Sequence, residues 1–167
     1  MPTELSAIQL LAFDVDGVLT DGRIWFDEEG REMHAFHVHD GMGMVLASRR
    51  GPLLVAISGR GAPGVKARLT QLRVREIHLG IDDKVQVLRD AAGRHDIPLE
   101  ACCFVGDDIN DVATMKLVGL AVAPANAHPS ALTAAHWCTQ ARAGHGVLRE
   151  VLDAIWMARP PLEGARS

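Results

Sequence analysis

The segment Leu10-Leu11-Ala12-Phe13-Asp14-Val15-Asp16-Gly17-Val18-Leu19-Thr20 places two aspartates directly after an apolar run. Such a run is typical of a buried β-strand, and the glycine after the aspartates indicates a turn. Residues i and i+2 of an extended segment point to the same side, so both carboxylates can face one site. Two carboxylates this close repel each other and therefore need a cation or a shared proton. The pattern predicts a nucleophile and a proton shuttle beside a metal and a phosphate, although an acidic turn after a core strand stays open for this segment alone.

Three further segments carry polar groups where a strand ends or a helix begins. The apolar run Leu53–Ser58 is followed by Gly59 and Arg60, and Lys84 stands at an expected helix start. The run Ala101–Val105 leads into Gly106-Asp107-Asp108-Ile109-Asn110-Asp111. Each segment is weak evidence alone, because short polar clusters often form turns or cap helices. Since ligands of open α/β sheets bind beyond the carboxyl ends of the strands, the four segments together predict one site.

In this order, over most of the chain, the four motifs resemble those of the haloacid dehalogenase superfamily of phosphatases. The resemblance implies that Asp14 is the nucleophile and that Asp16 acts first as a general acid and then as a base. It implies that Ser58 and Lys84 bind the phosphoryl oxygens. The implied product of the first step is an aspartyl-phosphate, which water then hydrolyses.

The same resemblance implies a bound Mg²⁺ ion. Asp14 and Asp107 are expected to supply side-chain oxygens, and Asp16 its backbone carbonyl. Asp108 and Asp111 are expected behind them, where they hold the metal's waters or the lysine. Oxygen ligands of this kind suit Mg²⁺, which keeps several waters in octahedral geometry.

Strand-like runs alternate with helical patterns along the whole chain. This alternation predicts an α/β fold, a Rossmann-like three-layer arrangement with a parallel sheet, in a single domain over residues 1–167. Strands are expected at Ile8–Asp14, Leu53–Ser58, Glu76–Leu79, Ala101–Gly106 and Leu120–Ala123. Helices are expected at Gly41–Arg50, Gly64–Leu72, Asp82–His95, Asp111–Val118 and His145–Met157. After about residue 158, two prolines end the last helix and predict a mobile tail to residue 167.

A protruding β-hairpin is expected at about residues 22–37, around the sequence Asp27-Glu28-Glu29-Gly30. Neither this interval nor the one between Ser58 and Lys84 has room for a cap domain, so the chain resembles the capless branch of the family. Trp25 and Phe26 would suit a subunit interface if the hairpin projects, whereas they would be core residues if it folds back. In this branch the resemblance implies a homotetramer in which hairpins associate.

The segment Ala35-Phe36-His37-Val38-His39-Asp40-Gly41-Met42-Gly43 resembles the branch that acts on eight- and nine-carbon sugar acid phosphates. The favoured substrate is the eight-carbon 3-deoxy-D-manno-octulosonate 8-phosphate, which implies a step of lipopolysaccharide biosynthesis. His39 and Val45 stand where this branch often has basic residues, which leaves acylneuraminate or deaminated neuraminate 9-phosphates open. The implied substrate contacts are Asp16, His37, Val38, His39, Asp40, Gly41, Ser58, Gly59, Arg60, Arg68 and Lys84.

Composition narrows the function classes. The 167 residues are 48% hydrophobic and 23% charged with a net charge of −4, which argues against a nucleic-acid partner. No apolar stretch approaches the roughly 20 residues that span a bilayer. The three cysteines are expected to be core thiols of a reduced cytoplasmic protein. Two other functions stay open, a non-catalytic module associated with a sugar-nucleotide synthetase and a phosphomutase, although a mutase would need a cap to exclude water.

Overall fold

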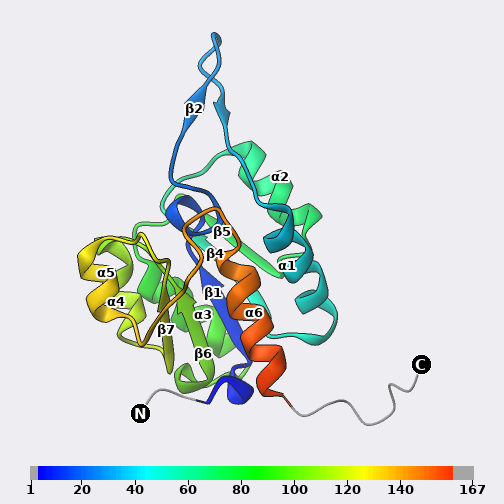
Figure 1. The fold of residues 1–167 in the computed structure, drawn as a ribbon, viewed down its shortest axis with the longest axis vertical. Helices are drawn as coiled ribbons and strands as arrows, with labels where there is room; N and C mark the ends of the chain where they lie inside the picture. The colour runs from blue at the N-terminus through cyan, green and yellow to red at the C-terminus, as the bar shows by residue number, and fades with distance from the viewer. Residues whose placement is uncertain (1–3, 160–167) are drawn as a thin grey trace.

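A computed structural model describes residues 4–159 of the chain. Its centre is a six-stranded sheet in the order β5-β4-β1-β6-β7-β8, in which all neighbours are parallel (Figure 1). The four residues of β1 are completely buried, as expected for a central strand covered on both faces. The predicted α/β class is therefore confirmed. The strands are β1 (Leu10–Phe13), β4 (Leu53–Ser58), β5 (Glu76–Leu79), β6 (Cys102–Val105), β7 (Leu120–Ala123) and β8 (Trp137–Cys138).

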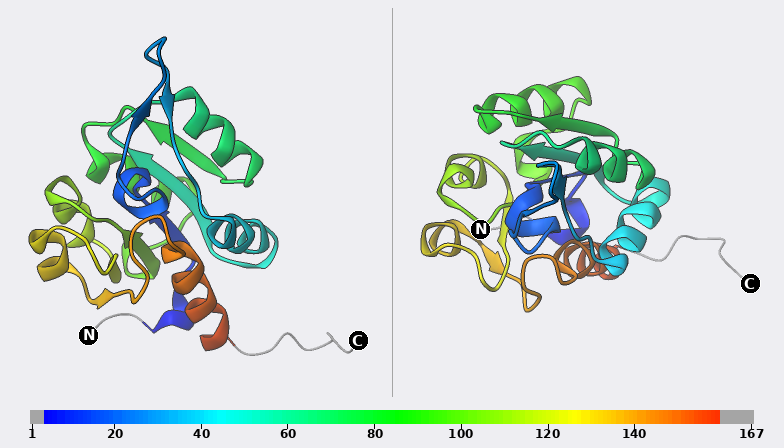
Figure 2. Two further views of the ribbon diagram at one scale, coloured as in Figure 1. Left: turned by 45° about the horizontal axis from the view of Figure 1, so that its top comes forward. Right: turned by 90° about the horizontal axis from the view of Figure 1, so that it is seen from above.

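Alternate residues of each strand face two separate hydrophobic clusters, one on each side of the sheet. Leu11 and Phe13 face the helices α1, α2 and α6, whereas Leu10 and Ala12 face α3, α4 and α5. Figure 2 shows these helices on either side of the sheet, which gives the three layers. The helices are α1 (Val38–Arg50), α2 (Pro63–Gln71), α3 (Lys84–Arg94), α4 (Val112–Met115), α5 (Pro129–Ala134) and α6 (Val147–Ala158).

The hairpin consists of β2 (Trp25–Phe26) and β3 (Glu32–Met33), which pair antiparallel and stand away from the sheet (Figure 1). Trp25 is 59% and Phe26 is 61% exposed, so the hairpin does not fold back onto the domain. Between β1 and β4 the chain holds this hairpin and α1, and between β4 and β5 it holds α2. Neither interval contains a cap domain.

Several expected elements differ from the structure. The helix expected over 111–118 is a 3₁₀ turn, Ile109–Asp111, followed by the four residues of α4. Strand β8 and helix α5 were not predicted, although Pro129 in the first turn of α5 is a usual start signal. Short 3₁₀ turns also lie at Leu5–Ala7 and Leu99–Ala101.

Two remaining expectations concern exposure and the chain end. Cys102 and Cys103 are buried as expected, but Cys138 is exposed, because β8 is a two-residue strand at the sheet edge. The expected tail lies, from residue 160 onward, outside the described residues. Over residues 4–159, the structure has no helix with the length and apolar character needed to cross a membrane.

Candidate active site

The parallel sheet brings the polar ends of three strands together. Asp14 follows β1, Ser58 ends β4, and Asp107 lies two residues beyond β6. Lys84 begins α3 and extends into the same place, where its side chain is 3% exposed. β1 lies between β4 and β6 in the sheet, so the predicted nucleophile lies between the other two groups.

Lys84 is a buried cation held by two carboxylates. Its Nζ lies 2.9 Å from Asp14 Oδ2 and 2.7 Å from Asp111 Oδ1. Burial by itself would lower the pKa of Lys84, but the two carboxylates outweigh it and raise that pKa. The lysine is therefore a fixed positive charge beside Asp14, the predicted nucleophile, where a phosphate would be attracted.

Asp111 acts as a positioning residue. Its Oδ2 accepts hydrogen bonds from the backbone N–H groups of Asp107 (2.9 Å) and Asp108 (3.3 Å), while its Oδ1 binds Lys84. Asp108 in turn accepts from the backbone N–H of Ile109 at 2.7 Å and caps the 3₁₀ turn. Both oxygens of Asp111 are thus committed within the protein.

Asp107 differs from Asp111, because one of its carboxylate oxygens has no partner among the described residues. Its Oδ1 is buried and has no hydrogen-bond partner within the described part of the chain. Gly17, at φ +86°, leaves the room for this carboxylate, because a Cβ at that position would lie 2.0 Å from Asp107 Oδ2. A side chain at residue 17 would displace the aspartate. A buried carboxylate oxygen without a donor is the arrangement that a cation completes.

Among residues 4–159, the group whose ligand atoms all lie within 4.8 Å of one another is Asp14, Asp107 and Asp111. Since Lys84 and two backbone amides already bind Asp111, we assign the first two as candidate metal ligands. Burial, with the neighbouring carboxylates, raises the pKa of Asp107 to about 7. Burial also raises the pKa of Asp14 to about 6, although Lys84 opposes the shift. A divalent cation would offset this charge, so the oxygen-rich donor set fits Mg²⁺.

Asp16 lies after β1, within the helical turn Val15–Leu19. The backbone angles of Asp16 and Gly17 in this turn are not helical. The Oδ1 atom of Asp16 accepts a hydrogen bond from Thr20 Oγ1 at 3.2 Å. Its Oδ2 lies 3.7 Å from Arg60 Nε, and the side chain is 18% exposed. The carboxyl group of Asp16 is therefore accessible to a ligand, while Thr20 and Arg60 limit its orientation.

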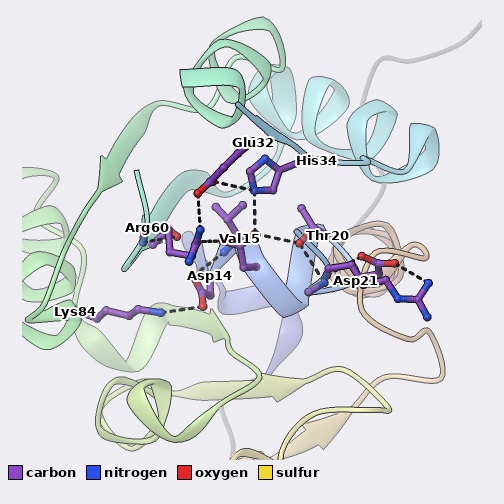
Figure 3. A network of polar contacts seen from close by, with 12 residues as sticks. Asp14, Val15, Thr20, Asp21, Glu32, His34, Arg60 and Lys84 are labelled. Carbon is purple, nitrogen blue, oxygen red and sulfur yellow. Dashed lines mark hydrogen bonds and ion pairs between the residues drawn. The ribbon is translucent and has the colours of Figure 1, made fainter. Parts of the chain in front are cut away.

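Two residues of this network were missed in the sequence. Glu32, on β3, binds Arg60 at 2.6 Å between Oε1 and the guanidinium. His34 follows β3, and its Nε2 lies 3.7 Å from Asp16 Oδ1. Figure 3 shows both side chains above the loop that carries Asp14 and Val15. No local motif marks them, because the hairpin brings them to the site from 16 and 18 residues along the chain.

The loop after β4 adds Ser58, Gly59 and Arg60. Ser58 is buried, and its hydroxyl accepts a hydrogen bond from the backbone N–H of Arg60 at 3.3 Å. This turn places the start of the loop beside the end of β1, since β1 and β4 are neighbours. The arrangement agrees with phosphoryl binding by Ser58, which stays a prediction.

The expected sugar pocket divides into exposed and buried residues. Val38 and His39 are exposed at the start of α1, and His37 packs its ring 4.9 Å from that of His39. Asp40 is completely buried, and its oxygens accept from the backbone N–H groups of Gly146 (3.1 Å) and Arg149 (2.8 Å). The carboxylate of Asp40 therefore anchors the start of α6, and its expected contact with a substrate stays a prediction.

Gly41 is likewise buried and packs against α2. A Cβ at this position would lie 2.8 Å from a guanidinium nitrogen of Arg68, so the glycine permits the two helices to approach. Arg68 also donates to Gln71 at 2.8 Å. Gly41 therefore has a packing role, and its expected ligand contact stays a prediction. Arg68 lies on the α2 surface next to it.

Known proteins resemble this chain in sequence and in fold. Residues 73–151 match the family model described as haloacid dehalogenase-like hydrolase. The 3-deoxy-D-manno-octulosonate 8-phosphate phosphatase KdsC of Yersinia pestis is 37% identical over 158 residues, covering 95% of this chain and 84% of the relative. The enzyme of the same name from Escherichia coli strain K12 is 37% identical over 159 residues, covering 95% and 85%. The chain belongs to the haloacid dehalogenase-like hydrolase family.

Solved structures of the same group resemble it closely. The 3-deoxy-D-manno-octulosonate 8-phosphate phosphatase of Moraxella catarrhalis, in complex with a magnesium ion, a phosphate ion and a KDO molecule, has a TM-score of 0.90. It is 33% identical, with 93% of this chain and 90% of that chain covered. The Yersinia pestis structure has a TM-score of 0.92 at 36% identity, with 96% and 87% covered.

Proposed function

We propose that this chain is a Mg²⁺-dependent phosphatase that hydrolyses 3-deoxy-D-manno-octulosonate 8-phosphate to the free sugar acid and phosphate. The observation that carries the proposal is the pairing of Asp14 with the buried Lys84, beside the unpartnered oxygen of Asp107. This arrangement combines a carboxylate nucleophile with the positive charge that a phosphate dianion requires. The curated relatives of this name, at 37% identity over nearly the whole chain, support the substrate.

The residues divide the reaction between them. Asp14 attacks phosphorus, while Asp16 donates its proton to the departing sugar oxygen. Lys84 and Ser58 hold the phosphoryl oxygens, and Lys84 stays charged throughout because two carboxylates raise its pKa. Asp16 then accepts a proton from the water that hydrolyses the aspartyl-phosphate. Asp14, Asp107 and the backbone carbonyl of Asp16 would hold Mg²⁺, which would neutralise charge at the phosphoryl group.

The sugar is expected to contact His37, Val38 and His39 at the start of α1, and Arg60 in the loop after β4. His39 leaves the nine-carbon acylneuraminate and deaminated neuraminate 9-phosphates as the alternative substrates. Phosphate release should be measured with Mg²⁺ from the eight-carbon ester, the nine-carbon esters and ordinary hexose phosphates. A preference of more than tenfold for the eight-carbon acid supports the proposal. Equal slow turnover of all esters would remove the sugar assignment.

The control is Asp14→Asn, which removes the nucleophile and keeps the size of the side chain. This variant should bind Mg²⁺ and phosphate esters no more tightly than the unmodified chain does, and it should release no phosphate. Turnover by Asp14→Asn would refute the aspartyl-phosphate mechanism. Binding without turnover by the unmodified chain on every ester would favour the non-catalytic module instead.

We also propose that the chain forms a single domain and works in the cytoplasm. Four copies are proposed to assemble as a homotetramer through the hairpin. Trp25, Phe26 and Met33 expose large apolar side chains on this hairpin, and such patches are typical of interfaces. Replacing Trp25 and Phe26 with serine should reduce the mass measured by light scattering. An unchanged mass would contradict a hairpin interface.

A further inference from the structure

The base of the hairpin contributes two side chains to the surroundings of Asp16. Glu32 lies on β3, and His34 lies one residue beyond that strand. Glu32 binds Arg60, and His34 lies near both Glu32 and the carboxyl group of Asp16, which Arg60 also approaches. Figure 3 shows Glu32, His34 and Arg60 close together. None of these contacts is required to form the hairpin itself, whose pairing is between Trp25 and Met33 and between Phe26 and Glu32.

His34 is buried without a hydrogen bond. Its side chain is 3% exposed, and Nε2 has no hydrogen-bond partner within the described residues. That nitrogen lies 3.7 Å from Asp16 Oδ1 and 3.8 Å from Glu32 Oε2. A buried polar atom left without a partner costs about 1–3 kcal/mol. Small shortening of the contact to Asp16 would remove this cost, so the ring is placed to meet that carboxyl group.

Glu32 determines where Arg60 lies. Its Oε1 binds the guanidinium at 2.6 Å, whereas Arg60 Nε stays 3.7 Å from Asp16 Oδ2. Arg60 is 47% exposed and its side chain is long, so it would otherwise have freedom to form a close two-point pair with Asp16. Such a pair would occupy the oxygen that must exchange a proton. Glu32 keeps the arginine beside the carboxyl group without closing that pair.

We propose that Glu32 and His34 are positioning residues for Asp16. His34 fixes the carboxyl group from one side, Thr20 hydrogen-bonds the same oxygen, and Glu32 restrains Arg60 on the other oxygen. The inference rests on the proposed function, because it concerns proton transfer by Asp16. In that transfer the Asp16 proton moves to the leaving alcohol oxygen as its bond to phosphorus breaks, and the attacking water later returns a proton to Asp16.

The test compares two leaving groups in the full chain. An alkyl phosphate needs a proton from Asp16 to leave, whereas p-nitrophenyl phosphate leaves readily without one. The first-turnover rates of both are measured by rapid quench and by nitrophenolate absorbance, with saturating Mg²⁺. Their ratio does not depend on the fraction of folded protein. Any alkyl phosphate that the unmodified chain hydrolyses can serve as the first substrate. The comparison therefore stays valid even if the proposed sugar is wrong.

His34→Leu should lower the first-turnover rate on the alkyl ester at least about tenfold, since general acid catalysis contributes about 10²–10⁴ in all. The rate on p-nitrophenyl phosphate should fall less than about threefold, and KM should change little. His34→Gln restores an N–H donor of similar reach and should recover most of the alkyl rate. Glu32→Gln should lower the alkyl rate in the same selective way.

Glu28→Gln is the matched control. It lies in the turn of the same hairpin, is exposed and should leave the ratio unchanged. Equal losses on both esters in His34→Leu, or no loss at all, would overturn the inference while the proposed function stands. An unmodified chain that hydrolyses no ester would overturn the proposed function itself.

Discussion

Replacing Lys84 with methionine isolates the electrostatic role of this lysine. Methionine has a similar length and no charge, so the variant keeps most of the packing. It leaves Asp14 and Asp111 without the cation that now lies 2.9 Å and 2.7 Å from their oxygens. Because Lys84 is buried, solvent cannot replace it. Removing one partner of a buried ion pair costs about 3–5 kcal/mol, and we expect a loss of that size at pH 7.5 without metal.

The sign of the pH dependence follows from the carboxylates. Without the lysine, whose charge lowers it, the folded-state pKa of Asp14 rises further above its unfolded value. Stability from such groups is present at low pH and is lost as the pH rises through the folded pKa. The deficit of Lys84→Met should therefore shrink between pH 7.5 and pH 5. Added Mg²⁺ should also reduce it, since a cation neutralises the same cluster.

Urea unfolding followed by circular dichroism at both pH values, with EDTA or Mg²⁺, measures these free energies. The slope m should match that of the unmodified chain, so that the midpoint reports stability. Lys116→Met, at an exposed position, is the control and should change the free energy by less than about 0.5 kcal/mol. A deficit below about 1 kcal/mol at pH 7.5, or one equally large at pH 5, would refute the reasoning.

Three further predictions concern the metal, the start of α6 and the thiols. Because the pKa values of Asp14 and Asp107 are raised to about 6 and about 7, metal-free protein should lose thermal stability as the pH rises from 4 to 8. Calorimetry should show Mg²⁺ reversing that loss, and a flat profile would contradict the charge argument. Asp40→Asn should cost about 1.5–3 kcal/mol through weaker hydrogen bonds to α6, with KM unchanged, as urea unfolding and kinetics would show. A raised KM at normal stability would instead make Asp40 a ligand contact. A thiol reagent should label native protein at Cys138 and leave Cys102, whose pKa burial raises to about 11, unlabelled by mass spectrometry. Rapid labelling of Cys102 would indicate that its strand opens.

The sequence was most informative where the chemistry follows a strand directly. Asp14, Ser58 and the acidic cluster from Asp107 each come at the end of an apolar run, so their meeting follows from the parallel sheet alone. Lys84 was harder to place, since a lysine at a helix start is ordinarily solvated. Its motif resemblance identified it, and the structure shows that two carboxylates make its burial possible.

Neighbouring residues of one sequence motif lie in different surroundings in the folded chain. Val38 and His39 are exposed, whereas Asp40 and Gly41 in the same segment are buried against α6 and α2. A helix turns its successive residues through about 100°, so a contiguous motif cannot face one pocket. The structure shows which residues of this segment are exposed and which pack against helices, while their contacts with a sugar stay predictions.

By itself, the sequence determined the alternation of the main strands and helices, though not α5 and β8, together with the absence of a cap domain and the main acidic cluster. These follow from local periodicity and from residues adjacent to strand ends. The resemblance implied that Asp108 and Asp111 hold the metal's waters or the lysine, and the tertiary structure decided that Asp111 binds Lys84 and two backbone amides. The tertiary structure alone decided that Glu32 and His34 lie around Asp16 and Arg60. Such contacts join segments distant along the chain. Their geometry depends on how the hairpin and the sheet pack in space, which no spacing of residues records.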